Sequence, residues 1–171
     1  MVKIAIVGAA GKMGKMIVSA CQKHQDIMIS GATEVPGSPF VGQDIGLNAG
    51  CAKTNTLISD SLEKAFFDAD VVIDFTFPEA TMENLDLCVK FHKKIVIGTT
   101  GLTKDQLEKI RQASESIAIV QSPNMSVGVN LLFQVAAQLA KSLQDYDIEI
   151  IEAHHHFKKD APSGTAMKIA E

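Results

Sequence analysis

The sequence has a single arginine, Arg111, among its 16 basic residues, no tryptophan, and no apolar run near the ~20 residues of a membrane-spanning helix. Forked guanidinium contacts to phosphates and bases are therefore scarce. The formal net charge of −4 gives the chain no general attraction for nucleic acid or for an anionic membrane. Together these absences argue against nucleic-acid binding and against membrane insertion.

Cysteines are also few, and no two of Cys21, Cys51 and Cys88 have the C-x-x-C spacing of a zinc or redox site. An odd number of widely separated cysteines argues against a disulfide framework. The N-terminus lacks the basic start and long apolar stretch of a signal peptide. We therefore expect a cytoplasmic protein that holds no metal.

Short apolar runs alternate along the chain with segments of helical period. The pattern predicts strands over residues 2–7, 27–33, 71–75, 95–97, 117–120 and 148–151, and helices over 13–23, 60–68, 78–92, 103–116, 126–143 and from about 163. Residues 35–55, rich in glycine and proline, are interpreted as a loop with room for a short strand. Continuous Val/Ile strands that alternate with helices predict an α/β, Rossmann-like parallel sheet with helices on both faces.

The character of the sequence changes after five β-units. We place a domain boundary there, with a dinucleotide-binding domain over residues 1–125 and the start of an α+β substrate-binding domain over 126–171. A piece as short as the second rarely buries enough surface to stand alone, since even ~60-residue domains are marginal.

A glycine-rich turn, Gly8-Ala-Ala-Gly11-Lys-Met-Gly14, directly follows the first strand and opens a helix. Gly8 suits a tight turn, Gly11 the approach of a pyrophosphate, and Gly14 close packing of helix on strand. Glu34 ends the second strand, where a carboxylate accepts hydrogen bonds from an adenosine ribose. The combination favours dinucleotide binding; the alternative is a plain turn beside a solvated glutamate.

Two further strand ends carry polar, glycine-bearing turns, at residues 75–78 and 98–101. A ligand of an open parallel sheet lies beyond the carboxyl ends of its strands, so these turns are candidate contacts for the nicotinamide ribose. Either turn could equally serve only to connect a strand to a helix.

Residues 152–166 follow a predicted strand. They contain several imidazole and ammonium groups and then a Pro-Ser-Gly-Thr turn. Histidine suits proton transfer near neutral pH, Lys158 adds positive charge, and the Ser163–Thr165 turn offers N–H groups to an anion. This combination predicts a pocket for an anionic small molecule that undergoes proton transfer. The alternatives are zinc held by His154 and His156, which lacks an evident third ligand, and a solvated basic loop.

The run from Glu152 to Ala166 resembles the E-x-H-H-x-x-K-x-D-A-P-S-G-T-A signature of the 4-hydroxy-tetrahydrodipicolinate (dihydrodipicolinate) reductase family. Segments 8–14, 73–76, 97–101 and 122–130 are similar to that family as well. The resemblance implies an oxidoreductase of lysine and diaminopimelate biosynthesis, in which hydride passes from NAD(P)H to a cyclic imine dicarboxylate.

The resemblance also implies roles for individual residues. His154 would donate or accept a proton, Lys158 would be a second donor, His155 would contact substrate, and Gly164 and Thr165 would hold a substrate carboxylate. Cofactor contacts would come from Gly8, Ala9, Ala10, Gly11, Lys12, Met13, Glu34, Gly98, Thr99, Thr100, Ser122, Pro123, Asn124 and Met125.

The chain departs from the family pattern in two ways. Many members have arginine directly after the ribose-binding acid, and this chain has Val35, so we expect NADH to be preferred and NADPH accepted. Family members are also longer and form homotetramers through the substrate-domain sheet. We therefore expect a truncated chain, unstable or inactive alone.

The sequence leaves two other functions open. One is a related dehydrogenase acting on aspartate semialdehyde or homoserine; the former needs an activated cysteine, which no polar strand-end loop offers. The other is a non-catalytic dinucleotide-binding module of the same fold.

Overall fold

The computed structural model describes residues 1–156 and 161–171, which form two compact units, residues 1–121 and 122–171. The boundary predicted from the sequence, after residue 125, lies slightly later in the chain. Within the described residues, no helix is both long enough and apolar enough to cross a bilayer.

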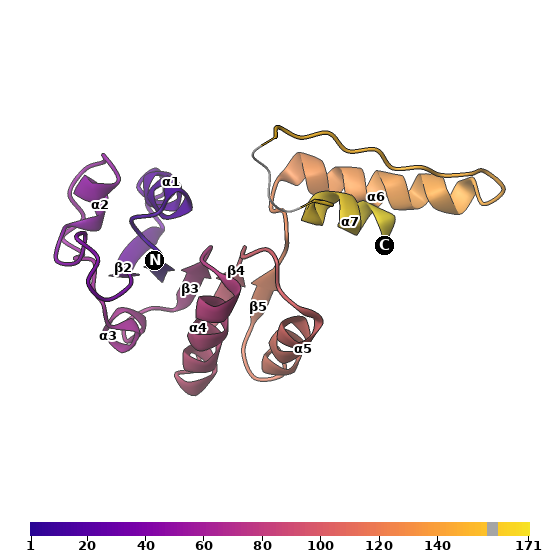
Figure 1. Ribbon diagram of the computed structural model, residues 1–171. Helices are drawn as coiled ribbons and strands as arrows, with labels where there is room; N and C mark the ends of the chain where they lie inside the picture. Colours follow the sequence, from indigo (N-terminus) through magenta and orange to yellow (C-terminus); the bar gives the residue numbers. More distant parts are fainter. Residues whose placement is uncertain (157–160) are drawn as a thin grey trace. The chain divides into compact units, whose positions relative to one another are not determined.

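The first unit is built on a parallel sheet. Its strands are β1 (Val2–Val7), β2 (Ile27–Thr33), β3 (Val71–Asp74), β4 (Lys94–Ile97) and β5 (Ile119–Gln121). They lie in the order β2-β1-β3-β4-β5, from the left of the sheet to its right in Figure 1. The Rossmann-like α/β architecture predicted from the sequence is confirmed.

Helices connect these strands, namely α1 (Lys12–Cys21), α2 (Ile45–Asn48), α3 (Leu62–Phe66), α4 (Pro78–Lys90) and α5 (Lys104–Ala113). Pro78 is the first residue of α4, and Thr103 with Gln106 forms a complete capping box before α5, as predicted. Helix α4 ends earlier than predicted, because His92 has a left-handed φ of 51°.

Helix α2 was not predicted, since it lies in the glycine- and proline-rich stretch interpreted as loop. Asp44 caps it: the carboxylate accepts hydrogen bonds from the N–H groups of Gly46 and Leu47 at 3.0 and 3.1 Å. The same carboxylate accepts from the N–H of Asn55 at 2.7 Å, which fixes the return of the loop.

Side chains that alternate along β1 face two separate hydrophobic cores. Ala5 and Val7 face a core formed with α3, α4 and α5, whereas Ile4 and Ile6 face a core formed with α1 and α2. Helices therefore cover both faces, as predicted, but the cover thins toward β5. Val120, on the same face as Ile6 by register, is 58% exposed.

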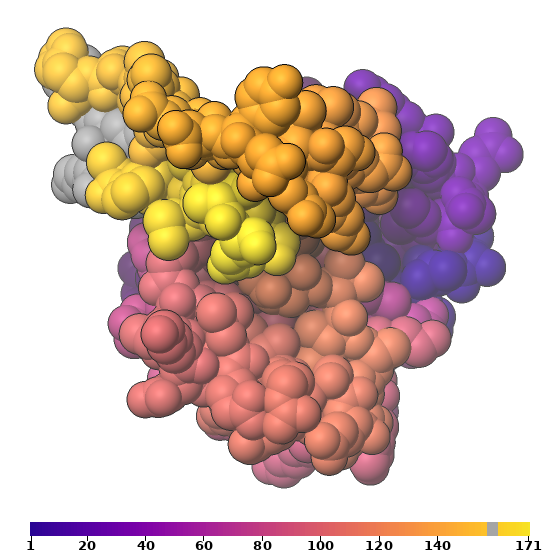
Figure 2. All heavy atoms as spheres, turned by 90° about the vertical axis from the view of Figure 1, so that its right-hand side faces the viewer, coloured from indigo at the N-terminus to yellow at the C-terminus, as the bar shows by residue number. Residues whose placement is uncertain are grey.

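The second unit contains α6 (Val127–Ser142) and α7 (Gly164–Ala170), which contact each other and appear in orange and yellow in Figures 1 and 2. No residue of α6 is buried against the described residues. Leu131 and Leu139, for example, are more than half exposed. The packing of this unit is consequently much thinner than that of the first.

The strand predicted over residues 148–151 is wrong. This segment forms no strand, and Ile148, Ile150 and Ile151 are exposed. A strand needs a neighbour for its N–H and C=O groups, and residues 122–156 and 161–171 contain no second strand to provide one. The segment therefore forms no strand in this structure, despite its β-forming composition.

Candidate functional site

The glycine-rich turn lies at the carboxyl end of β1 and is as tight as its sequence predicts. Gly8 has a left-handed φ of 65°, and the N–H of Gly11 donates to the Gly8 carbonyl at 3.0 Å. A Cβ on Gly14 would collide with the carbonyl oxygens of Gly8 and Ala9. Helix α1 therefore packs against the turn at a distance that only glycine permits.

The start of α1 is suited to an anion. Its N-cap is Gly11, and no side chain of the described residues caps it. The N–H groups of Lys12 and Met13 and the positive end of the helix dipole are consequently available to a ligand. Since both residues are exposed, a dinucleotide pyrophosphate fits this end of the helix.

Glu34 is held directly against the glycine turn. Its Oε1 atom accepts a hydrogen bond from the N–H of Ala10 at 2.8 Å, across 24 residues of sequence. Within the described part of the chain its Oε2 atom has no hydrogen-bond partner, which leaves that oxygen for a ribose hydroxyl. Val35, the next residue, is 69% exposed and offers no charge to a 2′-phosphate.

The turns after β3 and β4 are joined by a buried polar network. Asp74, fully buried, accepts from the N–H and hydroxyl of Thr76 at 2.9 and 2.6 Å and from the Asn84 amide at 2.9 Å. Thr99 Oγ1 accepts from the Thr76 N–H at 3.1 Å and bonds the Thr81 hydroxyl at 2.8 Å. No sequence motif indicated that Asn84 and Thr81 belong to this network.

This network limits what the predicted cofactor residues after β4 can offer. Thr99 is only 3% exposed and its hydroxyl is used inside the protein, so a cofactor contact there would have to come from backbone. Gly98 lies under the ring of Phe75, with no room for a Cβ. Thr100, by contrast, is exposed.

These strand ends meet where the strand order reverses, between β1 and β3. A Cβ on Gly8 would lie 3.0 Å from Thr76 Cγ2, so the turns after the two strands are in contact. Open α/β sheets bind ligands outside the carboxyl ends of their strands at such a reversal. The first unit thus brings residues 8–13, Glu34 and the turn after β3 to one edge.

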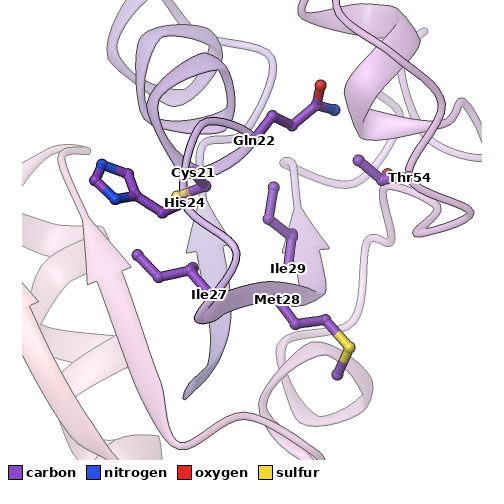
Figure 3. Close-up of a pocket in the computed structure, with 7 residues that line it drawn as sticks. All are labelled: Cys21, Gln22, His24, Ile27, Met28, Ile29 and Thr54. Carbon is purple, nitrogen blue, oxygen red and sulfur yellow. The ribbon is translucent and has the colours of Figure 1, made fainter. Parts of the chain in front are cut away.

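A pocket in the first unit lies elsewhere. It has a volume of about 230 Å³ and is lined by Cys21, Gln22, His24, Ile27, Met28, Ile29 and Thr54, drawn in Figure 3. These residues come from the end of α1, the start of β2 and the loop after α2, opposite the carboxyl ends of the strands. Burial raises the pKa of the Cys21 thiol, so it is not an activated nucleophile.

In the second unit, the predicted cofactor and substrate segments contact each other. Asn124 Nδ2 donates to Thr165 Oγ1 at 3.2 Å, and a Cβ on Gly164 would lie 3.4 Å from Pro123 Cβ. The turn itself is fixed by Ser122, whose hydroxyl donates to the Asn124 carbonyl at 2.7 Å. Met125, at the end of this segment, is 38% exposed.

Glu152 connects the predicted proton donor with the turn that begins α7. Its Oε1 accepts from the Ser163 N–H at 2.9 Å, and its Oε2 accepts from the Ser163 hydroxyl at 2.5 Å. His154 Nε2 lies 2.9 Å from the same Oε2. The Ser163 hydroxyl in turn accepts from the Ala166 N–H at 3.1 Å and caps the helix.

These donors hold the pKa of Glu152 at about 2, through the Ser163 hydroxyl first, then His154 and the Ser163 N–H. An ionised carboxylate only accepts hydrogen bonds, so His154 Nε2 carries the hydrogen of this pair. Glu152 belongs to the family signature, but its role could not be predicted from the sequence. The signal that could have indicated this contact is the spacing of Glu152 and His154, since residues i and i+2 of an extended segment lie on the same side.

The remaining predicted residues are placed as follows. His155 and His156 are exposed, and Lys158 lies outside the described residues. Among the described residues there is no group of three or more His, Cys, Asp or Glu side chains that could hold a metal ion.

The chain is similar to known proteins over its whole length. The family model described as dihydrodipicolinate reductase, N-terminus, matches residues 2–125, and the C-terminus model matches residues 128–171. The chain is 45% identical to the 4-hydroxy-tetrahydrodipicolinate reductase of Syntrophotalea carbinolica and 47% identical to that of Citrifermentans bemidjiense.

Both alignments cover all of this chain and 64% of the relative, so the chain spans about two thirds of the relatives' length. A solved dihydrodipicolinate reductase from Paenisporosarcina sp. TG-14, with dipicolinate bound, superposes with a TM-score of 0.78 at 30% identity. That match covers 99% of this chain and 64% of the other. The chain therefore belongs to the dihydrodipicolinate reductase family.

Proposed function

We propose that the protein catalyses the NAD(P)H-dependent reduction of 4-hydroxy-tetrahydrodipicolinate to tetrahydrodipicolinate, in lysine and diaminopimelate biosynthesis. The observation that carries this proposal is the cluster of Glu152, His154 and Ser163. It places an imidazole, which can transfer a proton, beside a turn at a helix start, which can bind an anion. A reaction that transfers a proton to an anionic substrate needs both groups. Membership of the reductase family favours this activity over the aspartate-semialdehyde and homoserine alternatives.

The cofactor would be held by the first unit. The start of α1 takes the pyrophosphate, and Glu34 Oε2 accepts from the adenosine ribose. When bound, NAD(P)H supplies the hydride. NADH is the preferred form, because the Glu34 carboxylate repels a 2′-phosphate and Val35 offers no cation to offset that repulsion.

The substrate would be held by the second unit. Its carboxylates suit the N–H groups and hydroxyl of Gly164 and Thr165, and the Asn124 amide holds the Thr165 hydroxyl in place. The Paenisporosarcina relative binds dipicolinate, a ring that carries two carboxylates, and we propose a cyclic dicarboxylate as the ligand here.

The reduction needs a proton as well as a hydride, and we assign its transfer to His154. The ring hydrogen-bonds Glu152 through Nε2, which leaves Nδ1 as the nitrogen to face the substrate. His155 would contact the substrate and Lys158 would be the second donor, as the family signature implies.

Substrate-dependent oxidation of NADH by the natural protein tests this function. We expect the nicotinamide absorbance to fall only when 4-hydroxy-tetrahydrodipicolinate is present, with no effect of a metal chelator. Binding of NADH and dipicolinate without any turnover would instead identify a dinucleotide-binding module. The homotetramer and the cytoplasmic location stay predictions, which sedimentation and cell fractionation can test.

A further inference from the structure

We propose that Glu152 is a positioning residue that holds His154 in one tautomer and ties it to the turn at the start of α7. The proposal deepens the proposed function, because it takes its catalytic meaning from His154 as the proton donor. No role for Glu152 was assigned from the sequence.

Both oxygens of the Glu152 carboxylate are used, and they connect two places in the chain. Oε1 binds the Ser163 N–H, whereas Oε2 binds the Ser163 hydroxyl and the His154 ring. The Ser163 hydroxyl then accepts from Ala166 inside α7. A chain of hydrogen bonds thus runs from the imidazole through one carboxylate into the first turn of the helix.

The burial of the partners makes this connection specific. Ser163 is 8% exposed, and the Glu152 side chain is 25% exposed, although the surrounding unit is mostly exposed. The Ser163 N–H points at Glu152, so loss of the carboxylate would leave a largely buried donor unpaired. Glu152 is therefore held in one orientation, and the imidazole that bonds it is held as well.

A fixed carboxylate decides which ring nitrogen of His154 is available for chemistry. Because Glu152 can only accept, the neutral ring carries its hydrogen on Nε2. When the protonated ring acts, the Nδ1–H bond breaks and that proton passes to the substrate. The ring that remains is the neutral Nε2–H form, which already matches its hydrogen bond to Glu152, so no reorientation is needed.

The direct test is the tautomer of His154, measured by nitrogen-15 NMR of the ring at a pH where histidine is neutral. We expect the Nε2–H form in the natural protein and a mixture of forms in Glu152→Gln, because an amide can donate as well as accept. The matched control is Glu149→Gln, which removes an exposed carboxylate from the same segment. An unchanged His154 signal in Glu152→Gln, or an equal change in the control, overturns the proposal.

Two further variants keep the proposal testable if Glu152→Gln misfolds. Ser163→Ala removes one donor but keeps the carboxylate, so His154 should stay in the Nε2–H form. Glu152→Asp keeps an ionised acceptor on a shorter side chain and should retain more of that form than Glu152→Gln. Loss of the Nε2–H form in Ser163→Ala would mean that the helix cap, and not Glu152, orients the ring.

Kinetics separates positioning from a merely structural role. We expect Glu152→Gln to lower kcat by about tenfold or more, with the affinity for NADH unchanged. In a His154→Ala background the same substitution should add almost nothing, because its effect acts through the ring. An equal further loss in the double variant overturns the proposal. A natural protein without reductase activity would refute the proposed function, while the tautomer measurement would still decide the role of Glu152.

Discussion

Glu34 is tied to the fold through one carboxylate oxygen and, in the proposed function, to cofactor choice through the other. Its Oε1 is bound to the Ala10 N–H within the glycine turn, so the residue that would read the ribose also fixes the loop that would hold the pyrophosphate. Substitutions at this position should therefore change affinity for both cofactors, and the ratio between them as well.

We expect NADH to bind at least as tightly as NADPH, and Glu34→Gln to shift the ratio toward NADPH because it removes the charge that repels the 2′-phosphate. Titration of both cofactors into the natural protein and the variant measures this. The control is Glu115→Gln, an exposed acid after α5. NADPH binding tighter than NADH by about tenfold, or 1.4 kcal/mol, would refute our interpretation of Glu34 and Val35.

Gly14 is the second residue on which the proposed cofactor site depends. Gly14→Ala would drive a Cβ into the Gly8 and Ala9 carbonyls, so we expect a loss of about 1–3 kcal/mol of stability, typical of overpacking, and weaker NADH binding. Thermal denaturation and NADH titration measure the two effects. In the matched control, Gly128→Ala, the nearest contact of the new Cβ is 4.0 Å away and alanine is the better helix former, so the substitution should be neutral or slightly stabilising. Equal melting temperatures for the two variants would contradict the proposed close packing of α1.

At the scale of elements, the start of α7 depends on the ionisation of Glu152. Its folded pKa of about 2 lies below its ordinary value of 4.5, so the folded form binds this proton more weakly than the unfolded chain. The stabilisation is therefore complete above about pH 4.5 and is lost as the pH falls toward 2.

We expect the amide resonances of Ser163 and Ala166 to lose their folded positions between about pH 4.5 and 2, in an NMR titration of the natural protein. In Glu152→Gln that titration should be absent, because the amide has no proton to bind in this range. A Ser163 amide that is insensitive to acid in the natural protein would show that the hydrogen bond does not persist in solution.

Elements whose signals are local could be predicted from the sequence. The Val/Ile runs of β1 and β3, Pro78 at the start of α4 and the capping box of α5 all lie within a few consecutive residues. Residues 148–151 misled the prediction because β-forming composition says nothing of a partner strand. Helix α2 was missed because its cap, Asp44, is hidden among glycines and prolines.

The candidate site shows the same limit. Motif residues such as Gly8 and His154 could be named from the sequence, but their contacts could not. Asn124 and Thr165 are 41 residues apart, and Glu152 and Ser163 are 11 apart. Only the folded chain brings them together, and Thr99, named as a cofactor contact, proved to have its hydroxyl buried in the Asp74 network.

On the scale of the whole molecule, the two units differ in how much they bury. Residues such as Ile6, Val72 and Ile95 are almost fully buried in the first, whereas α6 buries no residue against the described part of the chain. Local stability follows buried apolar contacts, so α6 should open at a lower free energy than the strands of the first unit.

Native-state hydrogen exchange tests this difference. We expect amides of β1, β3 and β4 to exchange only by global unfolding and those of α6 to exchange far faster in the 171-residue chain. NADH should slow exchange at the start of α1, because a ligand that binds the folded state stabilises it. Protection of α6 equal to that of β1 would contradict the packing described here.

We propose that the imidazole of His154 donates the proton in a reductase whose cofactor is bound by the first unit. Steady-state kinetics of His154→Ala in the natural protein, at saturating substrate, tests it most directly, with His24→Ala as the control. We predict a fall in kcat of about 10²–10⁴ with unchanged affinity for NADH, whereas Thr165→Val should mainly raise KM. A kcat within about threefold of the parent, far less than removal of a general acid costs, would contradict the account and leave His155 or Lys158 as the donor.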